Sequence, residues 1–309
     1  MKNTRFRGII PPVITPLKEQ NKLDIKGIYH LIDHILSGGV HGLFILGTTG
    51  EGPSLSYDLR YEMTQRVCSH VDGRVPVLVG ITDTSFTESI RLSKKAADVG
   101  ANAVVATPPY YFAPNQVELI TYFQALADRS PLPLFLYNMP SHTKVKFAPQ
   151  TVKKLSEHPN IIGLKDSSGD LLYFQNIARL FKSIPGFSLL VGPEEMLMQS
   201  MLSGGYGGVS GGANMFPKLY VAMYNAVRAR DFDRMKKLQE NILEISSKLY
   251  TIGNSPMRYL KGVKCALSVM GICNDALALP FHAFGKKEKE NVQQILENLN
   301  MRRLLYEFD

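Results

Sequence analysis

Short apolar segments recur along this chain at nearly constant intervals, and helical segments separate them. Each apolar segment is about the length of a buried parallel strand. The eight segments are residues 8–16, 42–48, 75–81, 103–108, 132–138, 161–166, 187–192 and 207–213. The first is an unusual strand, because Pro11 and Pro12 cannot donate to a ladder. Strands that alternate with helices in this way predict a parallel sheet.

Apolar stripes and capping residues mark the helices between the strands. Residues 28–36 keep apolar side chains at the i, i+3, i+4 spacing, and Gly38 ends the stripe. Ser56 is a suitable N-cap for the next helix, and Ser85 with Glu88 three residues later has the capping-box pattern. Further helices are expected over residues 117–127, 151–155, 172–181, 194–202 and 220–227.

Eight similar units favour a closed (β/α)8 barrel, a TIM barrel, over an open doubly wound sheet. The G-x-G-x-x-G fingerprint is absent after the first apolar segment, which also argues against the open sheet. We therefore predict an α/β fold with a catalytic barrel over residues 1–230. Residues 231–309 lack strand patterns and predict a C-terminal extension packed on the barrel. Its three helices are expected over residues 232–249, 256–270 and 288–305.

The composition is that of an ordinary globular protein. Of 309 residues, 45% are hydrophobic and 20% charged, which is sufficient for a hydrophobic core without disulfide bonds or structural metal ions. The 3 cysteines show neither a disulfide framework nor zinc-site spacing. No apolar run approaches the roughly 18–20 residues of a membrane span. Prolines interrupt the apolar stretch behind the basic N-terminus, which is unlike a signal peptide. A cytoplasmic protein is expected.

The net charge of +8 permits nucleic-acid binding, but the basic residues are spread along the chain. The densest runs, at 286–290 and 302–303, lie in helical sequence with acidic neighbours, which is typical of solvated faces. We expect no nucleic-acid partner. A positive field would instead draw anionic substrates such as keto acids toward a cleft.

A lysine ends the sixth apolar segment. Apolar residues run up to Lys165, and small polar residues follow it. Strand alternation places Ile161 and Gly163 on the same face as Lys165. Lysine is almost never fully buried without a reason. One interpretation is a nucleophile, since burial favours the neutral amine that attacks a ketone to form a Schiff base. The other is a lysine that extends from the strand end to pair with a carboxylate.

Polar residues at other strand ends favour the nucleophile. The active sites of TIM barrels lie at the C-terminal ends of the strands. Thr48 ends the second segment and Thr49 and Gly50 follow it, and their hydroxyls and backbone amides suit a carboxylate. Tyr111 follows the fourth segment, and Tyr137 lies at the end of the fifth. Each residue alone is also explained by a turn or an amphipathic core position. Together with the lysine they predict a proton relay around an amine nucleophile.

This combination resembles the dihydrodipicolinate synthase / N-acetylneuraminate lyase family. The motifs that carry the resemblance are GTTGE at 47–51, Tyr-Tyr at 110–111, Tyr-Asn-x-Pro at 137–140 and Gly-x-Lys at 163–165. Their order and spacing match along the whole chain. The resemblance implies a class I Schiff-base mechanism with pyruvate or another 2-keto acid and an aldehyde, without a metal or organic cofactor. It also implies a homotetramer of two tight dimers, or a homodimer.

The resemblance also implies roles for single residues. Lys165 matches the Schiff-base lysine, and Tyr137 matches the tyrosine that moves protons at the reacting carbon. Thr48 matches the threonine that links Tyr137 to a second tyrosine, matched by Tyr111, which enters the neighbouring subunit's site. The remaining matches are Thr49, which binds the pyruvate carboxylate, and Val209, whose backbone carbonyl approaches the keto acid.

One position departs from the synthase branch of the family. That branch has an arginine two residues after the proline of Tyr-Asn-x-Pro, where it holds the carboxylate of aspartate semialdehyde. Here the position is His142, which lacks the bidentate guanidinium and is mostly neutral at pH 7. This substitution argues against lysine-biosynthetic activity. The alternative is that His142 is a loop histidine without a special role.

The lyase branch holds the hydroxyls of its sugar acid with polar residues after strands six to eight. Ser167, Glu194 and Glu195 occupy similar positions here. The two glutamates are also explained as acidic residues at a helix N-terminus. We therefore favour an aldolase or lyase of a 2-keto-3-deoxy sugar acid or a sialic-acid-like substrate. The alternatives are a dehydratase of the same substrates, 4-hydroxy-tetrahydrodipicolinate synthase, and a keto-acid-binding protein without turnover.

Overall fold

The computed structural model describes residues 6–19, 21–184 and 186–299. Its eight parallel strands are β1 (Gly8–Ile9), β4 (Leu43–Ile45), β5 (Val77–Gly80), β6 (Ala103–Ala106), β7 (Leu134–Asn138), β8 (Ile161–Asp166), β9 (Ser188–Val191) and β10 (Gly207–Gly208). They pair in the order β1-β10-β9-β8-β7-β6-β5-β4. A parallel bridge between Pro12 and Phe44 joins the two ends of this order. The predicted TIM barrel is confirmed, and each strand lies within one predicted apolar segment.

The first apolar segment forms only a short strand, because its prolines lack backbone donors. The segment nevertheless pairs with β4 through other groups. Phe44 N–H donates to the Pro11 carbonyl at 2.9 Å, and Val13 N–H donates to the Phe44 carbonyl at 2.8 Å. The chain then forms a two-stranded hairpin, β2 (Leu17–Glu19) and β3 (Lys22–Leu23), which the sequence pattern did not predict.

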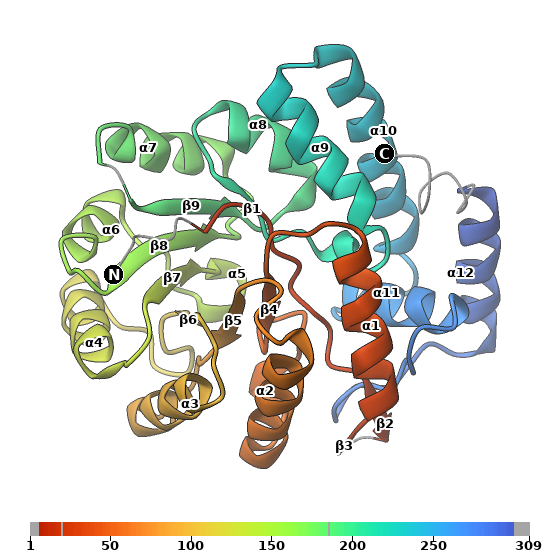
Figure 1. Ribbon diagram of the computed structural model, residues 1–309, viewed down its shortest axis with the longest axis horizontal. Coiled ribbons are helices and arrows are strands. Elements are labelled where there is room, and N and C mark those ends of the chain that lie inside the picture. The colour runs from red at the N-terminus through yellow and green to blue at the C-terminus, as the bar shows by residue number, and fades with distance from the viewer. Residues whose placement is uncertain (1–5, 20, 185, 300–309) are drawn as a thin grey trace.

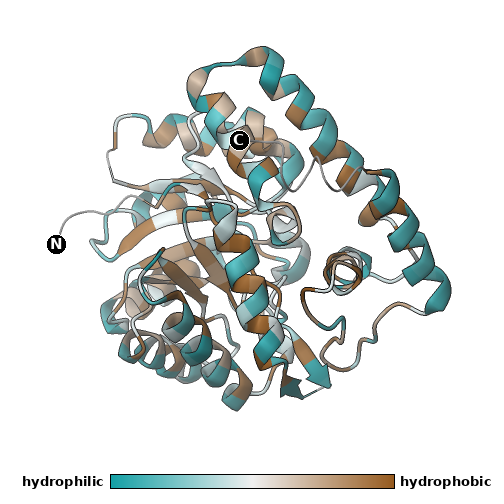
Figure 2. Cartoon of the chain, turned by 45° about the vertical axis from the view of Figure 1, so that its right-hand side comes forward, coloured by the Kyte–Doolittle hydropathy of each residue, from teal (hydrophilic) through white to brown (hydrophobic). Residues whose placement is uncertain are grey.

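Helices cover the outside of the barrel (Figure 1). They are α1 (Ile25–Ser37), α2 (Tyr57–Val71), α3 (Phe86–Asp98), α4 (Gln116–Arg129), α6 (Pro149–Leu155), α7 (Leu171–Phe181), α8 (Leu197–Leu202) and α9 (Pro217–Ala229). The short helix α5 (Pro140–Thr143) instead follows directly after β7 and lies at the C-terminal end of the barrel strands. Short 3-10 helices follow three strands: η1 (Gly52–Ser54), η2 (Glu194–Met196) and η3 (Gly211–Asn214). Figure 2 shows that these helices mix hydrophilic and hydrophobic residues, as amphipathic helices on a barrel do.

Two of the helix-start predictions have different outcomes. Ser56 caps α2 as predicted, and its side chain accepts a hydrogen bond from Leu59 N–H at 3.3 Å. The capping box predicted for Ser85 and Glu88 is wrong, because the Ser85 side chain makes no capping bond. Asp83 instead accepts the Ser85 N–H at 2.9 Å, and Glu88 pairs with Arg91.

The barrel encloses a small core of its own, separate from the larger core between the sheet and the helices. Inside the barrel pack Ile10, Phe44, Leu78, Ala103, Val105, Phe135, Tyr137, Leu190 and Val209. The expected alternation along β8 fails at its start. The register with β7 skips from Ile161 to Gly163, so Ile161 joins the outer core and Ile162 packs against the inner one.

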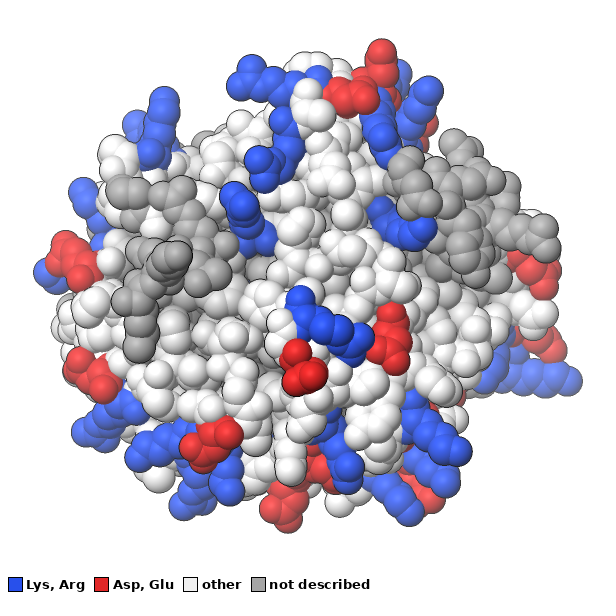
Figure 3. Space-filling view, viewed as in Figure 1, with Lys and Arg blue, Asp and Glu red and all other residues white. Residues whose placement is uncertain are grey.

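Three helices follow the barrel, as predicted: α10 (Phe232–Leu249), α11 (Arg258–Val269) and α12 (Lys286–Asn298). α10 packs against α9, and α12 packs against α11 at the edge of the molecule (Figure 1). The predicted end of the last helix, residues 300–305, lies outside the described residues. Among the helices described here, none is long and apolar enough to cross a membrane. Figure 3 shows Lys and Arg side chains scattered over one face with Asp and Glu among them, without a continuous basic patch.

Candidate active site

Two neighbouring strand ends place the lysine beside the tyrosine. Tyr137 on β7 pairs with Lys165 on β8, and Asn138 pairs with Asp166 one residue further on. Asn138 Nδ2 donates to Asp166 Oδ1 at 2.7 Å on the outer side of the barrel. Because side chains alternate along a strand, this buried link fixes the two inward side chains, Tyr137 and Lys165, next to each other.

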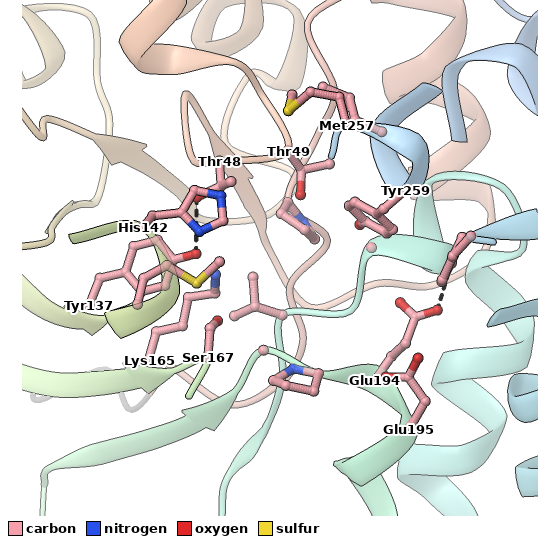
Figure 4. A pocket seen from close by; sticks show the side chains of 18 of the residues that line it. Thr48, Thr49, Tyr137, His142, Lys165, Ser167, Glu194, Glu195, Met257 and Tyr259 are labelled. Carbon is pink, nitrogen blue, oxygen red and sulfur yellow. Dashed lines mark hydrogen bonds between the residues drawn. The ribbon is translucent and has the colours of Figure 1, made fainter. Parts of the chain in front are cut away.

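The lysine, the tyrosine and one threonine form a compact group. Lys165 is only 6% exposed. Its Nζ lies 3.7 Å from the centre of the Tyr137 ring and 5.5 Å from that of Phe44. The Tyr137 hydroxyl shares a hydrogen bond with Thr48 Oγ1 at 3.2 Å. Figure 4 shows this group on one side of a cavity, opposite Glu194.

The environment of Tyr137 favours loss of its proton. Complete burial alone would raise the pKa of Tyr137. The positive charge of Lys165 and hydrogen bonds with Lys165, Thr48 and Ser167 act in the opposite direction and bring this pKa below its usual value. A tyrosine of this kind is suited to accept and return a proton during a reaction.

Most of the predicted site residues line one cavity of about 310 Å³. They are Thr48, Thr49, Tyr137, His142, Lys165, Ser167, Glu194, Glu195 and Val209. Gly50 and Tyr111 do not line it. The Gly50 carbonyl accepts a hydrogen bond from Thr15 Oγ1 at 2.6 Å, and a side chain at Gly50 would meet the backbone of Leu46. Gly50 is thus placed in the packed base of its loop.

Glu194 forms part of the opposite wall and is tied into the protein. Its Oε1 accepts hydrogen bonds from the hydroxyls of Tyr220 and Tyr250, both at 2.6 Å. Its Oε2 accepts from Gly212 N–H at 2.6 Å. Burial, and then the charge of Glu195, raise the pKa of Glu194 to about 7 despite these bonds. The carboxyl group therefore faces the cavity and also holds Tyr220, Tyr250 and the backbone at Gly212 together in its wall.

His142 lies on the short helix α5 at the edge of the cavity. Its Nδ1 is 3.0 Å from Ser141 Oγ. Burial, and then the charges of Lys144 and Lys165, lower the pKa of His142. The imidazole is therefore neutral near pH 7 and does not supply a cation to a second carboxylate.

A second cavity of about 500 Å³ adjoins the first. Both cavities are lined by Thr48, Tyr137, Met139, His142, Pro256 and Met257. Tyr110 lines the second cavity, whereas Tyr111 and Phe112 lie on the loop after β6 with exposed fractions of 78% and 83%. The structure of this chain thus leaves Tyr111 outside its own site.

The sequence analysis missed the residues that the C-terminal extension contributes. Tyr250, Pro256, Met257, Tyr259 and Leu260 all line the first cavity. Within the part of the chain that is described, no group of three or more His, Cys, Asp or Glu side chains could hold a metal ion. The polar groups that line this cavity are hydroxyls, an amine, an imidazole and carboxylates. Such a set suits a polar organic substrate.

Besides lining the cavity, the C-terminal extension is joined to the loop that carries Thr48 and Thr49. Glu51 follows this loop with a positive φ of 56°, and it forms a buried ion pair with Lys264 on α11. Glu51 Oε2 also accepts from Ala278 N–H at 2.8 Å, and Lys264 Nζ donates to the Ala276 carbonyl at 2.7 Å. This buried pair, whose members are 213 positions apart in the sequence, therefore joins the threonine loop to α11.

Comparison with known proteins gives one consistent result. Residues 5–299 match the model of the dihydrodipicolinate synthetase family. The 4-hydroxy-tetrahydrodipicolinate synthase of Methanoculleus marisnigri is 34% identical over 295 residues, which cover 95% of this chain and 99% of that protein.

Solved structures agree with this assignment. Dihydrodipicolinate synthase from Bacteroides thetaiotaomicron superimposes with a TM-score of 0.93 and 53% identity, over 95% of this chain and 98% of the other. YagE, a prophage protein of the dihydrodipicolinic acid synthase family from E. coli K12 solved in complex with pyruvate, gives a TM-score of 0.91 and 32% identity, over 96% and 99%. The chain therefore belongs to the dihydrodipicolinate synthetase family, whose members are lyases.

Proposed function

We propose that this protein is a class I aldolase that cleaves, or forms, a 2-keto-3-deoxy sugar acid or a sialic-acid-like substrate, with pyruvate as the keto-acid product or donor. The observation that carries the proposal is the buried Lys165 beside Tyr137, whose hydroxyl is linked to Thr48. An amine and a proton carrier at one cavity supply the two functions that cleavage of a carbon–carbon bond next to an imine needs.

The first step is imine formation. The amine nitrogen of Lys165 adds with its lone pair to C2 of the keto acid, and the adduct takes up a proton and loses water to give a protonated imine. Thr49 and Thr48 face the same cavity and hold the neighbouring carboxylate. The positive imine nitrogen then accepts the electron pair of the breaking C3–C4 bond.

The second step is the proton transfer that releases the aldehyde. Tyr137 accepts the proton of the C4 hydroxyl as the C3–C4 bond breaks, and its lowered pKa favours this role. The enamine left on Lys165 takes up a proton at C3, and water releases pyruvate from the lysine. Run in reverse, the same steps join pyruvate to an aldehyde.

The choice of a sugar acid rests on His142 and on the polar far wall. A neutral imidazole pairs better with hydroxyls than with a second carboxylate. Ser167, Glu194 and Glu195 add oxygen atoms that suit a chain of hydroxyl groups. Glu194 already accepts three hydrogen bonds from the protein, so Glu195 and Ser167 are the stronger candidates for direct contact.

A second candidate is the condensation of pyruvate with aspartate semialdehyde. It is favoured by relatives such as the 4-hydroxy-tetrahydrodipicolinate synthases of Methanoculleus marisnigri and Thermodesulfovibrio yellowstonii, at 34% and 33% identity. His142 argues against it, because the site then offers no bidentate cation for the semialdehyde carboxylate.

We further propose that the active form is a homodimer or a homotetramer in which Tyr111 completes the neighbouring site. Tyr111 and Phe112 project from the loop after β6, and their rings contact each other edge to face with centres 5.0 Å apart. Exposed aromatic side chains of this kind are typical of protein contacts. The adjoining cavity leads to Thr48, the residue that would receive a tyrosine from the partner.

A substrate panel tests the proposal. Pyruvate release is measured from 2-keto-3-deoxy sugar acids and from sialic acid, and a coupled assay is run with pyruvate and aspartate semialdehyde. We expect turnover of at least one 2-keto-3-deoxy acid, abolished in Lys165→Ala. Efficient turnover of aspartate semialdehyde alone would move the assignment to the synthase, and full activity of Lys165→Ala would refute the imine mechanism.

A further inference from the structure

We propose that Asn138 and Asp166 are positioning residues, and that their hydrogen bond holds the neighbouring Tyr137 and Lys165 in place for proton transfer at C3 of the bound keto acid. The inference rests on the proposed function, because it concerns a keto acid held as an imine on Lys165. Neither Asn138 nor Asp166 lines the catalytic cavity, so both act through the side chains next to them.

The two reactive side chains lie where their strand pair ends. Tyr137 and Lys165 form the last pair but one between β7 and β8. Asn138 and Asp166 form the last pair. Beyond Asn138 the chain enters α5 at Pro140, which has no backbone N–H with which to continue the ladder. Because the ends of elements open at the lowest cost in free energy, a link across the last pair steadies the pair before it.

The amide of Asn138 is fully buried, and its partners allow one orientation. Its Nδ2 donates to Asp166 Oδ1 at 2.7 Å, and its Oδ1 accepts from Phe147 N–H at 3.2 Å. A backbone N–H only donates, so the amide oxygen faces Phe147 and the NH2 group faces β8. The Asn138 carbonyl also accepts from Ser167 N–H at 2.8 Å. Asn138 therefore holds the ends of both strands.

Asp166 is held just as firmly from the side of β8, and it is 1% exposed. Its Oδ1 also accepts from Ser168 N–H at 3.2 Å, and its Oδ2 accepts from Ser168 Oγ at 3.0 Å. The Asp166 carbonyl accepts from Gly192 N–H, after β9, at 2.7 Å. A buried network thus joins three neighbouring strand ends on the outer side of the barrel, directly behind the reactive pair.

Proton transfer at C3 is the step that depends most on this arrangement. Loss of a C3 proton from the imine places its electron pair between C2 and C3, and the C=N pair moves to the nitrogen. Return of a proton to C3 reverses these movements. Lys165 carries the substrate and Tyr137 moves the proton, with Lys165 Nζ 3.7 Å from the centre of the Tyr137 ring (Figure 4). A displacement of about 1 Å between such groups can reduce a rate about 100-fold.

The test uses pyruvate alone and measures the exchange of its methyl hydrogens in D2O by NMR, corrected for exchange without protein. Each exchange requires imine formation and then proton transfer at C3. We expect Asn138→Ala to lower the maximal exchange rate at least about tenfold. The half-saturating pyruvate concentration should stay within about threefold, because imine formation needs only the amine and the groups that bind the carboxylate. Trapping with borohydride should still modify Lys165.

A conservative variant separates the hydrogen bond from the charge of Asp166. In Asp166→Asn, the new amide oxygen still accepts from Asn138, and the new NH2 group donates to the Ser168 hydroxyl. The maximal exchange rate should therefore remain within about threefold of the unmodified protein. Asp166→Ala removes the link and should lose as much as Asn138→Ala. It also replaces Asn138→Ala in the comparison if that variant does not fold.

The matched control is Asn160→Ala, at the opposite end of the same strands. Asn160 precedes β8, and its Nδ2 donates to the carbonyls of Ala127, Ser130 and Leu132 at 2.9–3.1 Å. This variant also removes asparagine hydrogen bonds beside β7 and β8, but far from the reactive pair. It should lower stability to urea without changing the maximal exchange rate.

The outcomes distinguish this inference from the proposed function. An unchanged maximal rate in the variants that lack the link would overturn the role of Asn138 and Asp166 and leave the aldolase proposal intact. The same holds if Asp166→Asn loses as much as Asp166→Ala, or if Asn160→Ala reduces the rate equally. Absence of both adduct and exchange in the unmodified protein would overturn the proposed function, and this inference with it.

Discussion

At the scale of single residues, the site depends on ionisable side chains that the fold has removed from water. Lys165, Glu194 and His142 all face one cavity, and each has a different neighbourhood. The same barrel mouth can therefore hold an amine, a carboxyl group with a pKa of about 7 and a neutral imidazole at one pH. Two predictions follow from the last two groups.

The first residue-scale prediction concerns His142. His142→Arg restores the planar cation that the synthase branch carries at this position. We expect the ratio of kcat/KM for aspartate semialdehyde to that for the 2-keto-3-deoxy acid to rise at least ~10-fold, because a charge-assisted hydrogen bond adds about 1.5–3 kcal/mol. His142→Asn, which stays neutral, is the control. An unchanged ratio in His142→Arg would show that this position does not select the substrate.

The second residue-scale prediction concerns Glu194 and pH. Its folded-state pKa of about 7 lies above its ordinary value of 4.5, so folding retains the proton. The resulting contribution to the free energy of unfolding is complete below pH 4.5 and is lost as pH rises to about 7. The loss amounts to about 3 kcal/mol.

Glu194→Gln should remove this loss, since an amide cannot ionise and can rotate to serve the same partners. The measurement is urea unfolding of both proteins from pH 4.5 to 8. The difference between them is the relevant quantity, because the lowered pKa values of His34, His41 and His142 change stability in the opposite direction over the same range. A difference that does not vary with pH would contradict the account of Glu194.

The residues that the sequence predicted best are those at strand ends. Lys165 and Tyr137 could be placed at one mouth because parallel strands of a barrel end on the same side. Tyr250 and Tyr259 could not be placed at the cavity from the sequence, since helical periodicity does not indicate which helix face meets the mouth of a barrel. The side-chain contacts of Glu194 could not be predicted from the sequence either, because they join residues as far apart as Glu194 and Tyr250.

At the scale of elements, the strands were predicted well and their local details less so. The apolar segments located all eight strands, but the skipped register at Ile162 turned Ile161 to the outer core. The capping box at Ser85 failed because Asp83, a residue before the helix, competes for the same backbone N–H. Such competition depends on the fold of a loop, which a local sequence pattern does not contain.

The element-scale prediction concerns the link between the threonine loop and α11. Lys264 is fully buried and Glu51 is 3% exposed, and they neutralise each other. Lys264→Met would leave Glu51 buried without its cation. We expect the free energy of unfolding, measured with urea, to fall by about 3–5 kcal/mol.

The matched control is the double variant Lys264→Met with Glu51→Gln, in which both charges are absent. It should recover a large part of the lost stability, because the main penalty is the unpaired charge. A single variant within about 0.5 kcal/mol of the unmodified protein would show that the pair does not hold the loop to the extension.

At the scale of the whole molecule, one chain holds Lys165 buried and presents Tyr111 outward. If Tyr111 serves the partner's site, two inactive variants should complement each other. In a mixed dimer of Lys165→Ala and Tyr111→Phe, one site has its own lysine and receives an intact tyrosine. Co-expression in equal amounts should restore about a quarter of full activity. Activity that stays at the level of the two separate variants would place the action of Tyr111 within its own chain or outside catalysis.

The central claim for the whole protein is that its chemistry runs through an imine on one lysine. Lys165 and Lys264 are both buried, but only the former has its amine at the cavity, while the latter is paired with Glu51. The most direct measurement is reduction with borohydride in the presence of excess pyruvate, followed by peptide mass spectrometry. The account predicts one pyruvate-derived adduct, on Lys165. Folded protein that yields no adduct, or an adduct on another lysine instead, would contradict it.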